Sequence, residues 1–358
     1  MNSILIKMRI AVYGAWHVKN FGDILLFDLY CQAIREVYPD STIIALEASD
    51  ALNRSHYMSY DRQTHSADAK QVLKSCDLMM YLGGGYFQEP DASYLKRMRW
   101  GLNILRKHMI PALYAKYHGV PIRIIGVGVG PITNPVSHLL VKLLYWASDK
   151  AAVRDLESKL FLIEKIKNSI GVIPDLGLYT KEMMNIETST KGNKLGVHLY
   201  DSPSNDRRLC GIVKFLRKIH DEGDHKIYFV KDKGGKDKRQ LSALSEVKHL
   251  IDGTIEYASP RQFVRDLNSL DSIITTKLHV GVVGVSLGKT VVSIPYHPKT
   301  KRFYNQVGRP DLCLDLNRYT TKEIYSLLAE ESGKTGRSEK YQVTSYDDVL
   351  TSLHSIIG

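Results

Sequence analysis

Short runs of apolar, often β-branched residues alternate with segments of helical periodicity along most of the chain, and this alternation restricts the fold more than any other feature. In the first half, strands are expected at 9–14, 42–46, 77–82, 122–127 and 151–153, and a helix at 23–37. Strands separated by helices usually form a parallel sheet with helices on both faces. The sequence therefore predicts an α/β fold in which ligands bind at the carboxyl ends of the strands.

The polar tract 181–194 interrupts the alternation, which then resumes with expected strands at 195–200, 226–230, 254–257, 272–276 and 290–295. The 358 residues, of which 44% are hydrophobic, are enough for two cores. We therefore predict two doubly wound, Rossmann-like domains, over 1–185 and 194–335. Helices are expected at 321–331 and 346–357, and the terminal segment 336–358 is expected to pack back on the first domain.

Composition excludes several classes of protein. No stretch reaches the roughly 18 apolar residues of a transmembrane helix, and no secretion signal is visible. The four cysteines are scattered without a C-x-x-C pair, so no metal site is expected and a reduced, cytoplasmic protein is the simplest interpretation. The net charge of +11 favours anionic partners, but no nucleic-acid-binding module accompanies it.

Residues 92–148 form a basic block that contains no Asp or Glu. Its eight cations are Lys96, Arg97, Arg99, Arg106, Lys107, Lys116, Arg123 and Lys142. Between 94 and 117 the cations alternate with apolar residues, as in a helix that lies on an anionic membrane. A solvated helix face in an α/β domain is an equal alternative, because Pro111 interrupts the segment.

Glycine-containing motifs follow several expected strands. Asn20, Gly22 and Asp23 precede a helix start, where backbone can approach an anionic ligand, although Asp23 is equally suited to be a helix N-cap. Gly83–Gly85 leaves room for a substrate over a strand end, or forms a tight turn. Neither this run nor 126–131 has the spacing of a Walker loop or a dinucleotide-binding motif, so no nicotinamide cofactor is expected.

Charged residues follow other expected strands. Arg154 can bind a carboxylate or a phosphate, or can pair with Asp155 inside the domain. Lys277 and His279 stand where a strand meets an apolar helix, so they can bind an anion and move a proton near neutral pH. Lys299, in the next loop, is either a further cation of this site or a solvated lysine.

Taken in order, these motifs resemble the polysaccharide pyruvyl transferase family over residues 9 to about 309. The set comprises N-x-G-D at 20–23, the triple glycine at 83–85, G-V-G-V-G-P at 126–131, R-D-x-x-S at 154–158, P-D at 174–175, an R-L-H-like element at 277–279 and Y-x-x-K at 296–299. Each motif is common by itself, whereas the ordered set is specific.

The resemblance implies a two-lobed fold of the GT-B glycosyltransferase type, with a central cleft between an N-terminal acceptor side and a C-terminal donor side. Family members transfer the enolpyruvyl group of phosphoenolpyruvate onto two hydroxyls of one sugar, which gives a cyclic pyruvate ketal and releases phosphate. The acceptors are precursors of surface polysaccharides or cell-wall glycans, often lipid-linked at the inner face of the membrane. Phosphoenolpyruvate serves as donor substrate and no cofactor is implied.

The resemblance also implies roles for individual residues. His279 matches the catalytic histidine, and Arg154 and Lys277 match cations that hold the donor. Lys277 stands where the family commonly has arginine, so it keeps the charge without the bidentate fork. Asp23 is a candidate for positioning or deprotonating an acceptor hydroxyl, and the further candidates for substrate binding are Lys299, Asn20, Gly22, Gly84 and Gly85.

Two other functions remain open on the sequence. A nucleotide-sugar-dependent glycosyltransferase would have the same two-domain shape, because fold does not settle function. A non-catalytic, membrane-associated protein of polysaccharide assembly would use the basic block instead. Protection by a nucleotide sugar alone would select the first function, whereas vesicle binding that survives loss of His279, without phosphate release, would select the second.

Overall fold

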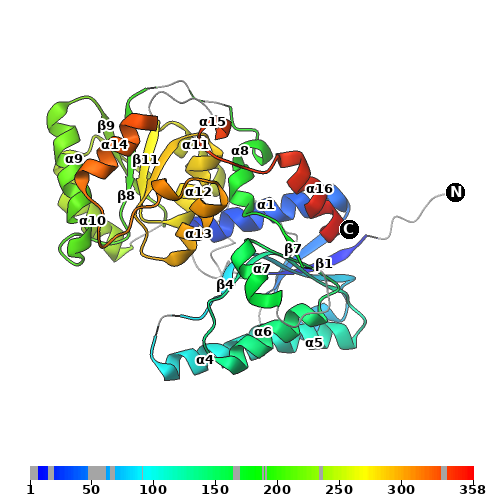
Figure 1. Cartoon of the computed structure of the whole chain (residues 1–358). Coiled ribbons are helices and arrows are strands. Elements are labelled where there is room, and N and C mark those ends of the chain that lie inside the picture. The colour runs from blue at the N-terminus through cyan, green and yellow to red at the C-terminus, as the bar shows by residue number, and fades with distance from the viewer. Residues whose placement is uncertain are drawn as a thin grey trace. The chain divides into compact units, whose positions relative to one another are not determined.

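The computed structural model describes residues 7–14, 20–46, 62–64, 69–90, 92–163, 170–187, 189, 192–233, 237–331 and 337–358. The chain divides into two compact units (Figure 1). Unit 1 comprises 1–18, 23–176 and 345–358, and unit 2 comprises 19–22 and 177–344. Within the described ranges, none of the helices has the length and apolar character needed to cross a bilayer.

The described strands of unit 1 form one parallel sheet in the order β3-β2-β1-β4-β5-β6-β7. Their bounds are β1 (Arg9–Tyr13), β2 (Thr42–Leu46), β3 (Arg62–Thr64), β4 (Leu78–Phe87), β5 (Ile122–Val129), β6 (Lys150–Val153) and β7 (Gly171–Val172). The interior strands are almost fully buried, which explains why they read as continuous apolar runs. The strand order reverses direction between β1 and β4.

Helices cover both faces of this sheet (Figure 1). One face carries α3 (Ala69–Leu73), α4 (Tyr94–Ile104), α5 (Ile110–Tyr117), α6 (Pro135–Ala147) and α7 (Leu156–Ile163), whose buried side chains join the strands in one core. The other face carries α1 (Phe21–Val37) and α16 (Tyr346–Ile357). The terminal helix packs on unit 1, where the Tyr38 hydroxyl donates to the Ile357 carbonyl at 3.1 Å.

The segment 94–117 is helical throughout. A π-helical turn η1 (Leu105–Met109) joins α4 to α5, and Pro111 is the second residue of α5. Proline has no N–H to donate to the preceding turn, and a π turn is a known way to accommodate a local change in the hydrogen-bond pattern. The expectation that Pro111 interrupts this segment is therefore wrong, because the helix continues through it.

Unit 2 contains a parallel sheet in the order β10-β9-β8-β11-β12. Its strands are β8 (Lys194–His198), β9 (Lys226–Lys231), β10 (Gly253–Glu256), β11 (Ser272–Thr275) and β12 (Thr290–Ser293). Its α-helices are α8 (Thr180–Met183), α9 (Cys210–Glu222), α10 (Lys238–Val247), α11 (Pro260–Asn268), α12 (Leu278–Ser286), α13 (Pro298–Gln306), α14 (Thr321–Glu331) and α15 (Arg337–Lys340). Short 3₁₀ turns are η2 (Leu176–Tyr179), η3 (Arg207–Leu209), η4 (Lys248–Leu250) and η5 (Pro310–Leu312).

The predicted α/β class is confirmed, and each sheet has the third-second-first-fourth strand order of a Rossmann fold. The boundary between the units falls at residues 176 and 177, earlier than the predicted division at 185–194. The reason is that α8 packs within unit 2, where the Lys181 amide donates to the Ser286 hydroxyl at 3.0 Å. Residues 188, 190 and 191 of the predicted linker lie outside the described residues. The central cleft stays a prediction.

The triple glycine lies inside a strand rather than after one, contrary to the sequence prediction. β4 continues to Phe87 and pairs Gly84 with Val127 of β5, with a register shift before Phe87. A side chain at Gly83 would meet the ring of Tyr30 at 2.4 Å, so this glycine makes room for a buried aromatic side chain. Gly84 has φ 106°, in the region that favours glycine.

Candidate functional site

Four polar residues of unit 2 meet where the strand order reverses, between β8 and β11. His198 ends β8, Asp232 follows β9, and Thr276 and Lys277 follow β11. These three strands are neighbours in the sheet, so their carboxyl ends lie side by side. Open α/β sheets bind ligands at this position.

Asp232 is the centre of the hydrogen-bonded cluster. One carboxylate oxygen lies 3.1 Å from His198 Nε2 and accepts a hydrogen bond from Gln240 Nε2 at 2.8 Å, and the other lies 3.0 Å from Lys277 Nζ. His198 Nδ1 is 3.1 Å from the Thr276 hydroxyl. An ionised carboxylate only accepts hydrogen bonds, so Nε2 carries the proton in the contact between His198 and Asp232.

The cluster keeps Asp232 ionised although its side chain is buried. Burial alone would raise the pKa of Asp232, but the interactions with His198 and Lys277 outweigh it and hold this pKa well below its usual range. The side chain of Lys277 is 17% exposed, while that of Asp232 is 1% exposed. The ammonium group of Lys277 is therefore partly exposed and is held in place by the buried carboxylate of Asp232.

His279 is the second residue of α12 and stands two positions after Lys277. The strand ends at Thr275, whose hydroxyl accepts a hydrogen bond from the Lys277 amide at 2.9 Å, and Lys277 then precedes the helix as its N-cap residue. All residues of α12 are buried, including His279 at 6% exposure. The short link from β11 to an apolar helix thus fixes both side chains at the end of the sheet.

Gly22 lies against the imidazole of His279. A Cβ atom at residue 22 would come 1.8 Å from His279 Nδ1, so only glycine leaves space for the ring. The neighbouring Phe21 holds this backbone in place, because its amide donates to the Asp232 carbonyl at 3.4 Å and its ring packs edge-on against Phe263 at 4.6 Å. The half-buried Asn20 directly precedes this anchored pair.

Asp23 belongs to unit 1 and is the third residue of α1. The helix begins at Phe21, two residues before the predicted start, so Asp23 lies inside the first turn and is not the N-cap. A carboxylate in the first turn still interacts favourably with the helix dipole. The side chain is half-buried.

Lys299 and Tyr296 follow β12 of unit 2, and Tyr200 follows β8. Lys299 is the second residue of α13, and its amide donates to the ring Nδ1 of His297 at 3.3 Å. The ring of Tyr296 lies 4.3 Å from that of Tyr200, which follows β8. Burial and the hydrogen bond to the Asp206 carboxylate raise the pKa of Tyr200 to about 12, so its hydroxyl stays protonated at neutral pH.

Arg154 of unit 1 is buried between two carboxylates. Nε is 3.6 Å from Asp155, and Nη1 is 3.6 Å from Asp175. Asp155 also accepts hydrogen bonds from the amide and hydroxyl of Ser158, at 2.8 and 2.6 Å, and so orders the first turn of α7. The ion pair between Arg154 and Asp155, which the sequence offered as the alternative to ligand binding, is thus present. Binding of the donor by Arg154 stays a prediction.

Glycines around Arg154 make room for the protein's own side chains. A Cβ at Gly128 would come 2.7 Å from Arg154 Nη2, and one at Gly126 would come 1.8 Å from the Tyr30 hydroxyl. At Gly85, by contrast, a Cβ would meet nothing within 4 Å. Among these glycines, Gly85 therefore borders open space.

The structure gathers Asn20, Gly22, Lys277 and His279 in unit 2 and places Asp23, Gly84, Gly85 and Arg154 in unit 1. Sequence reasoning missed His198, Asp232 and Gln240. The rule that ligands bind at strand ends could have drawn attention to Asp232, which follows the strand expected at 226–230, whereas His198 lay inside the strand expected at 195–200. No group of three or more His, Cys, Asp or Glu side chains that could hold a metal ion occurs in the described part of the chain.

Solved structures with the same two-unit, GT-B-type fold include three UDP-GlcNAc 2-epimerases. The Methanocaldococcus jannaschii structure is 13% identical with a TM-score of 0.62, and the comparison covers 93% of this chain and 94% of that one. The Rickettsia bellii structure is 10% identical with a TM-score of 0.59, covering 98% and 96%. The Neisseria meningitidis structure, bound to UDP-GlcNAc, is 10% identical with a TM-score of 0.57, covering 98% and 94%. At these identities the likeness shows the fold alone.

The chain belongs to the polysaccharide pyruvyl transferase family, whose model matches residues 20–298. The match includes every predicted site residue except Lys299. No curated protein matches the chain. Membership in this family supports a transferase activity for the chain. The resemblance to this family that the sequence motifs indicated is confirmed.

Proposed function

We propose that this protein transfers the enolpyruvyl group of phosphoenolpyruvate onto two hydroxyls of a sugar in a polysaccharide or cell-wall glycan precursor. The observation that carries the proposal is the placement of His279 beside Lys277 at the switch point of unit 2, with Gly22 packed on the imidazole. The pairing supports the proposal because an imidazole can carry a proton and Lys277 is a cation held by Asp232, in a chain of the pyruvyl transferase family.

The reaction needs proton transfer and positive charge. Protonation of the methylene carbon of phosphoenolpyruvate makes C2 electrophilic, and one sugar hydroxyl forms a C–O bond to C2 and gives up its proton. The bond from C2 to the phosphate oxygen breaks, and the second hydroxyl adds to C2 and gives up its proton. One of these two protons balances the proton added to carbon, and the other leaves with phosphate.

In this proposal His279 carries one of the protons, which is help worth about 10²- to 10⁴-fold. Lys277 holds the anionic donor and the departing phosphate. Asp232 contacts both Lys277 and His198 and so positions Lys277, which means that Asp232 and His198 act through Lys277 rather than on the substrate. Arg154 and Lys299 add positive charge for the donor.

Asp23 positions or deprotonates an acceptor hydroxyl in this scheme, and the acceptor and donor further contact Asn20, Gly22, Gly84 and Gly85. Gly85 is suited to this role because a side chain there would meet open space. The protein works in the cytoplasm with phosphoenolpyruvate as donor and without a cofactor. The acceptor is a saccharide, either free or lipid-linked.

The test is phosphate release from phosphoenolpyruvate with a panel of saccharide acceptors. We expect His279→Gln to lower turnover about 10²- to 10⁴-fold. The matched control is His225→Gln, because His225 is exposed and lies on the loop before β9. Near-full turnover by His279→Gln, with the control also active, would show that His279 is not the proton carrier.

A further inference from the structure

Exposed apolar side chains are concentrated on one group of helices in unit 1. Of the sixteen large hydrophobic side chains exposed in the described residues, eleven lie between 94 and 146: Tyr94, Leu95, Met98, Leu102, Ile110, Leu113, Tyr117, Val136, Leu139, Leu143 and Trp146. They are carried by the continuous helix of α4, η1 and α5 and by α6, which packs alongside it (Figure 1). We call the exposed side of these four elements the basic face. Apolar surface gathered in this way marks an interaction site.

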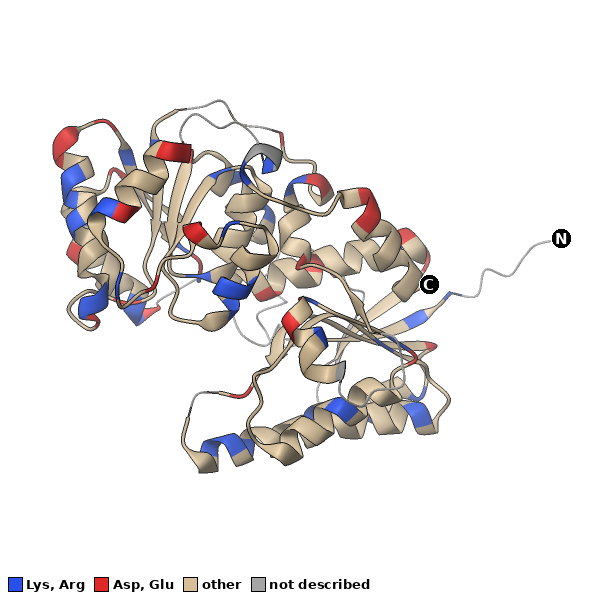
Figure 2. Ribbon diagram, viewed as in Figure 1, with Lys and Arg blue, Asp and Glu red and all other residues tan. Residues whose placement is uncertain are grey.

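The charge of the basic face has one sign. Figure 2 shows Lys and Arg on α4, α5 and α6 without any Asp or Glu, as the acid-free stretch 92–148 requires. Lys116 pairs with Asp149, and Arg97 donates to the Thr133 hydroxyl at 2.9 Å, so these two cations are engaged within the unit. The exposed cations of this face are Lys96, Arg99, Arg106 and Lys107. An anionic partner fits this face.

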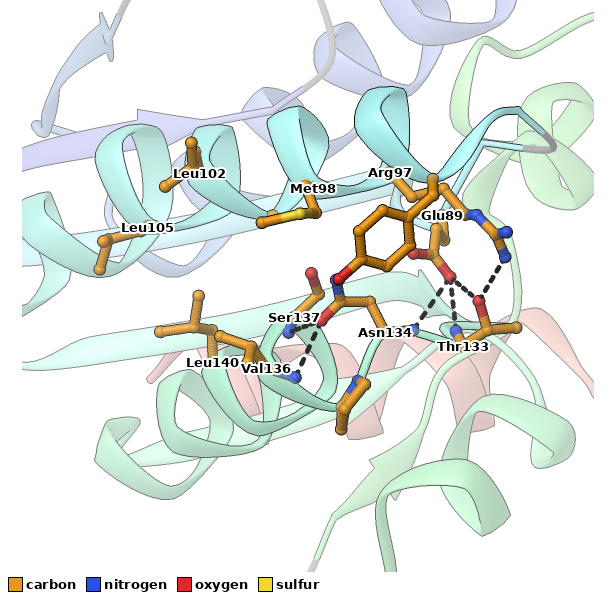
Figure 3. A pocket seen from close by; sticks show the side chains of 13 residues that line it. Glu89, Arg97, Met98, Leu102, Leu105, Thr133, Asn134, Val136, Ser137 and Leu140 are labelled. Atoms are coloured by element: carbon orange, nitrogen blue, oxygen red, sulfur yellow. Dashed lines mark hydrogen bonds between the residues drawn. The ribbon is translucent and has the colours of Figure 1, made fainter.

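A pocket of about 530 Å³ opens between α4 and α6. Figure 3 shows Met98, Leu102 and Leu105 on one wall and Val136 and Leu140 on the other. These five side chains give both walls an apolar stretch, although Arg97 and Ser137 also line the pocket.

Polar groups close one end of the pocket and bind one another. A carboxylate oxygen of Glu89 accepts hydrogen bonds from the amide and hydroxyl of Thr133, both at 2.5 Å, and from the Asn134 amide at 3.3 Å. The Asn134 side chain in turn caps α6 through the amides of Val136 and Ser137. Three other polar atoms of lining residues, Glu89 Oε1, Arg97 Nε and Ser137 Oγ, are buried without a hydrogen bond to any described residue. A hydrocarbon chain therefore suits the part of the pocket that is lined by Leu102, Leu105, Val136 and Leu140.

We propose that the basic face lies on an anionic lipid bilayer and that the pocket between α4 and α6 takes an acyl chain of that bilayer. A helix pair with cations beside exposed leucines, and with Trp146 and Tyr117 exposed at its surface, has the composition of an interfacial surface. A symmetric dimer through the same face would bring its exposed cations together, which disfavours a second copy of this chain as the occupant. The inference does not depend on the proposed transfer reaction.

Cosedimentation of the full chain with phosphatidylcholine vesicles, with and without phosphatidylglycerol, tests the proposal. We expect binding that requires phosphatidylglycerol and weakens as salt is added. The double substitution Lys96→Glu with Arg99→Glu should lower the affinity about tenfold or more. Its matched control is Lys214→Glu with Arg217→Glu on α9, which changes the same charge at the same spacing on another exposed helix face and should leave binding unchanged.

Leu102→Gln tests the pocket, and Leu160→Gln is its control because both leucines are 59% exposed on helices of unit 1. We expect a several-fold loss of binding for the first and none for the second. Equal effects of the two leucine substitutions would overturn the acyl-chain site. Three results would overturn the membrane proposal. The first is binding without a preference for phosphatidylglycerol, and the second is no binding at low salt. The third is no vesicle binding together with a dimer that Leu102→Gln dissociates. Unchanged melting temperatures would verify that each variant is folded.

Discussion

The backbone of Gly22 touches the imidazole ring of His279, so closely that a Cβ atom at residue 22 would lie 1.8 Å from Nδ1. The two residues are 257 positions apart in the sequence, yet both belong to unit 2. The N-x-G-D motif therefore begins helix α1 and also provides the backbone surface against which the His279 ring packs. This relationship explains why a glycine is needed there.

Gly22→Ala is predicted to displace the His279 ring and to lower turnover about 10²-fold, because a misplacement of about 1 Å is enough for such a loss. Phosphate release from phosphoenolpyruvate measures the effect. Gly171→Ala is the control, since the nearest atom to a Cβ there is 3.5 Å away, an ordinary contact. Full activity of Gly22→Ala would mean that the ring position does not matter for the reaction.

Asp232→Asn is predicted to lower the free energy of unfolding at neutral pH by about 3 kcal/mol, because it leaves Lys277 and His198 without their buried anion. Chemical unfolding measures this loss. Asp221→Asn, at an exposed position of α9, should change stability little.

The same substitution should change the response to acid. The pKa of Asp232 lies well below its usual range in the folded protein, so its ionisation stabilises the fold above the unfolded-state pKa of about 4. That contribution is lost as the pH falls through the folded-state pKa. The difference in unfolding free energy between wild type and Asp232→Asn should therefore shrink below about pH 4, and a constant difference would rule out this role.

Lys289 should make stability rise with pH in the alkaline range. Burial lowers the pKa of Lys289 from 10.5 to about 8, although its amine donates to the Asn268 carbonyl at 2.6 Å. Folding therefore disfavours the charged form, and this penalty is complete below about pH 8 and vanishes above about pH 10.5.

Lys289→Met lacks the titrating group, and the comparison cancels the titration of other residues. Between pH 8 and 10.5 the unfolding free energy of the wild type should rise relative to the variant, by at most about 3 kcal/mol. Urea unfolding at several pH values measures the difference. A flat difference would indicate that Lys289 keeps its ordinary pKa.

Local periodicity was sufficient to predict most elements of the fold. The helices α14 and α16 and the strand β2 have the predicted bounds, because each carries its pattern within its own residues. The structure around the glycines of β4 was harder to predict, because a run of three glycines is typical of a loop. They belong to a strand because pairing with β5 and the buried ring of Tyr30 determine the backbone there.

The candidate site was only partly predictable. His279 and Lys277 were found because they stand together at the junction of a strand and a helix. His198 and Asp232 were not found because their chemistry depends on strand order, which brings β9, β8 and β11 together. Neither residue has a local motif, so only the topology of the sheet shows that they support Lys277.

The most direct test of the proposed function is the thermal stability of the purified protein in the presence of phosphoenolpyruvate, with nucleotide sugars in parallel. A ligand at 100 times its dissociation constant stabilises the native state by about 2.7 kcal/mol. We predict stabilisation of the wild type by phosphoenolpyruvate and its loss in Lys277→Ala and Arg154→Ala. Stabilisation by a nucleotide sugar alone would contradict the account and indicate a glycosyltransferase.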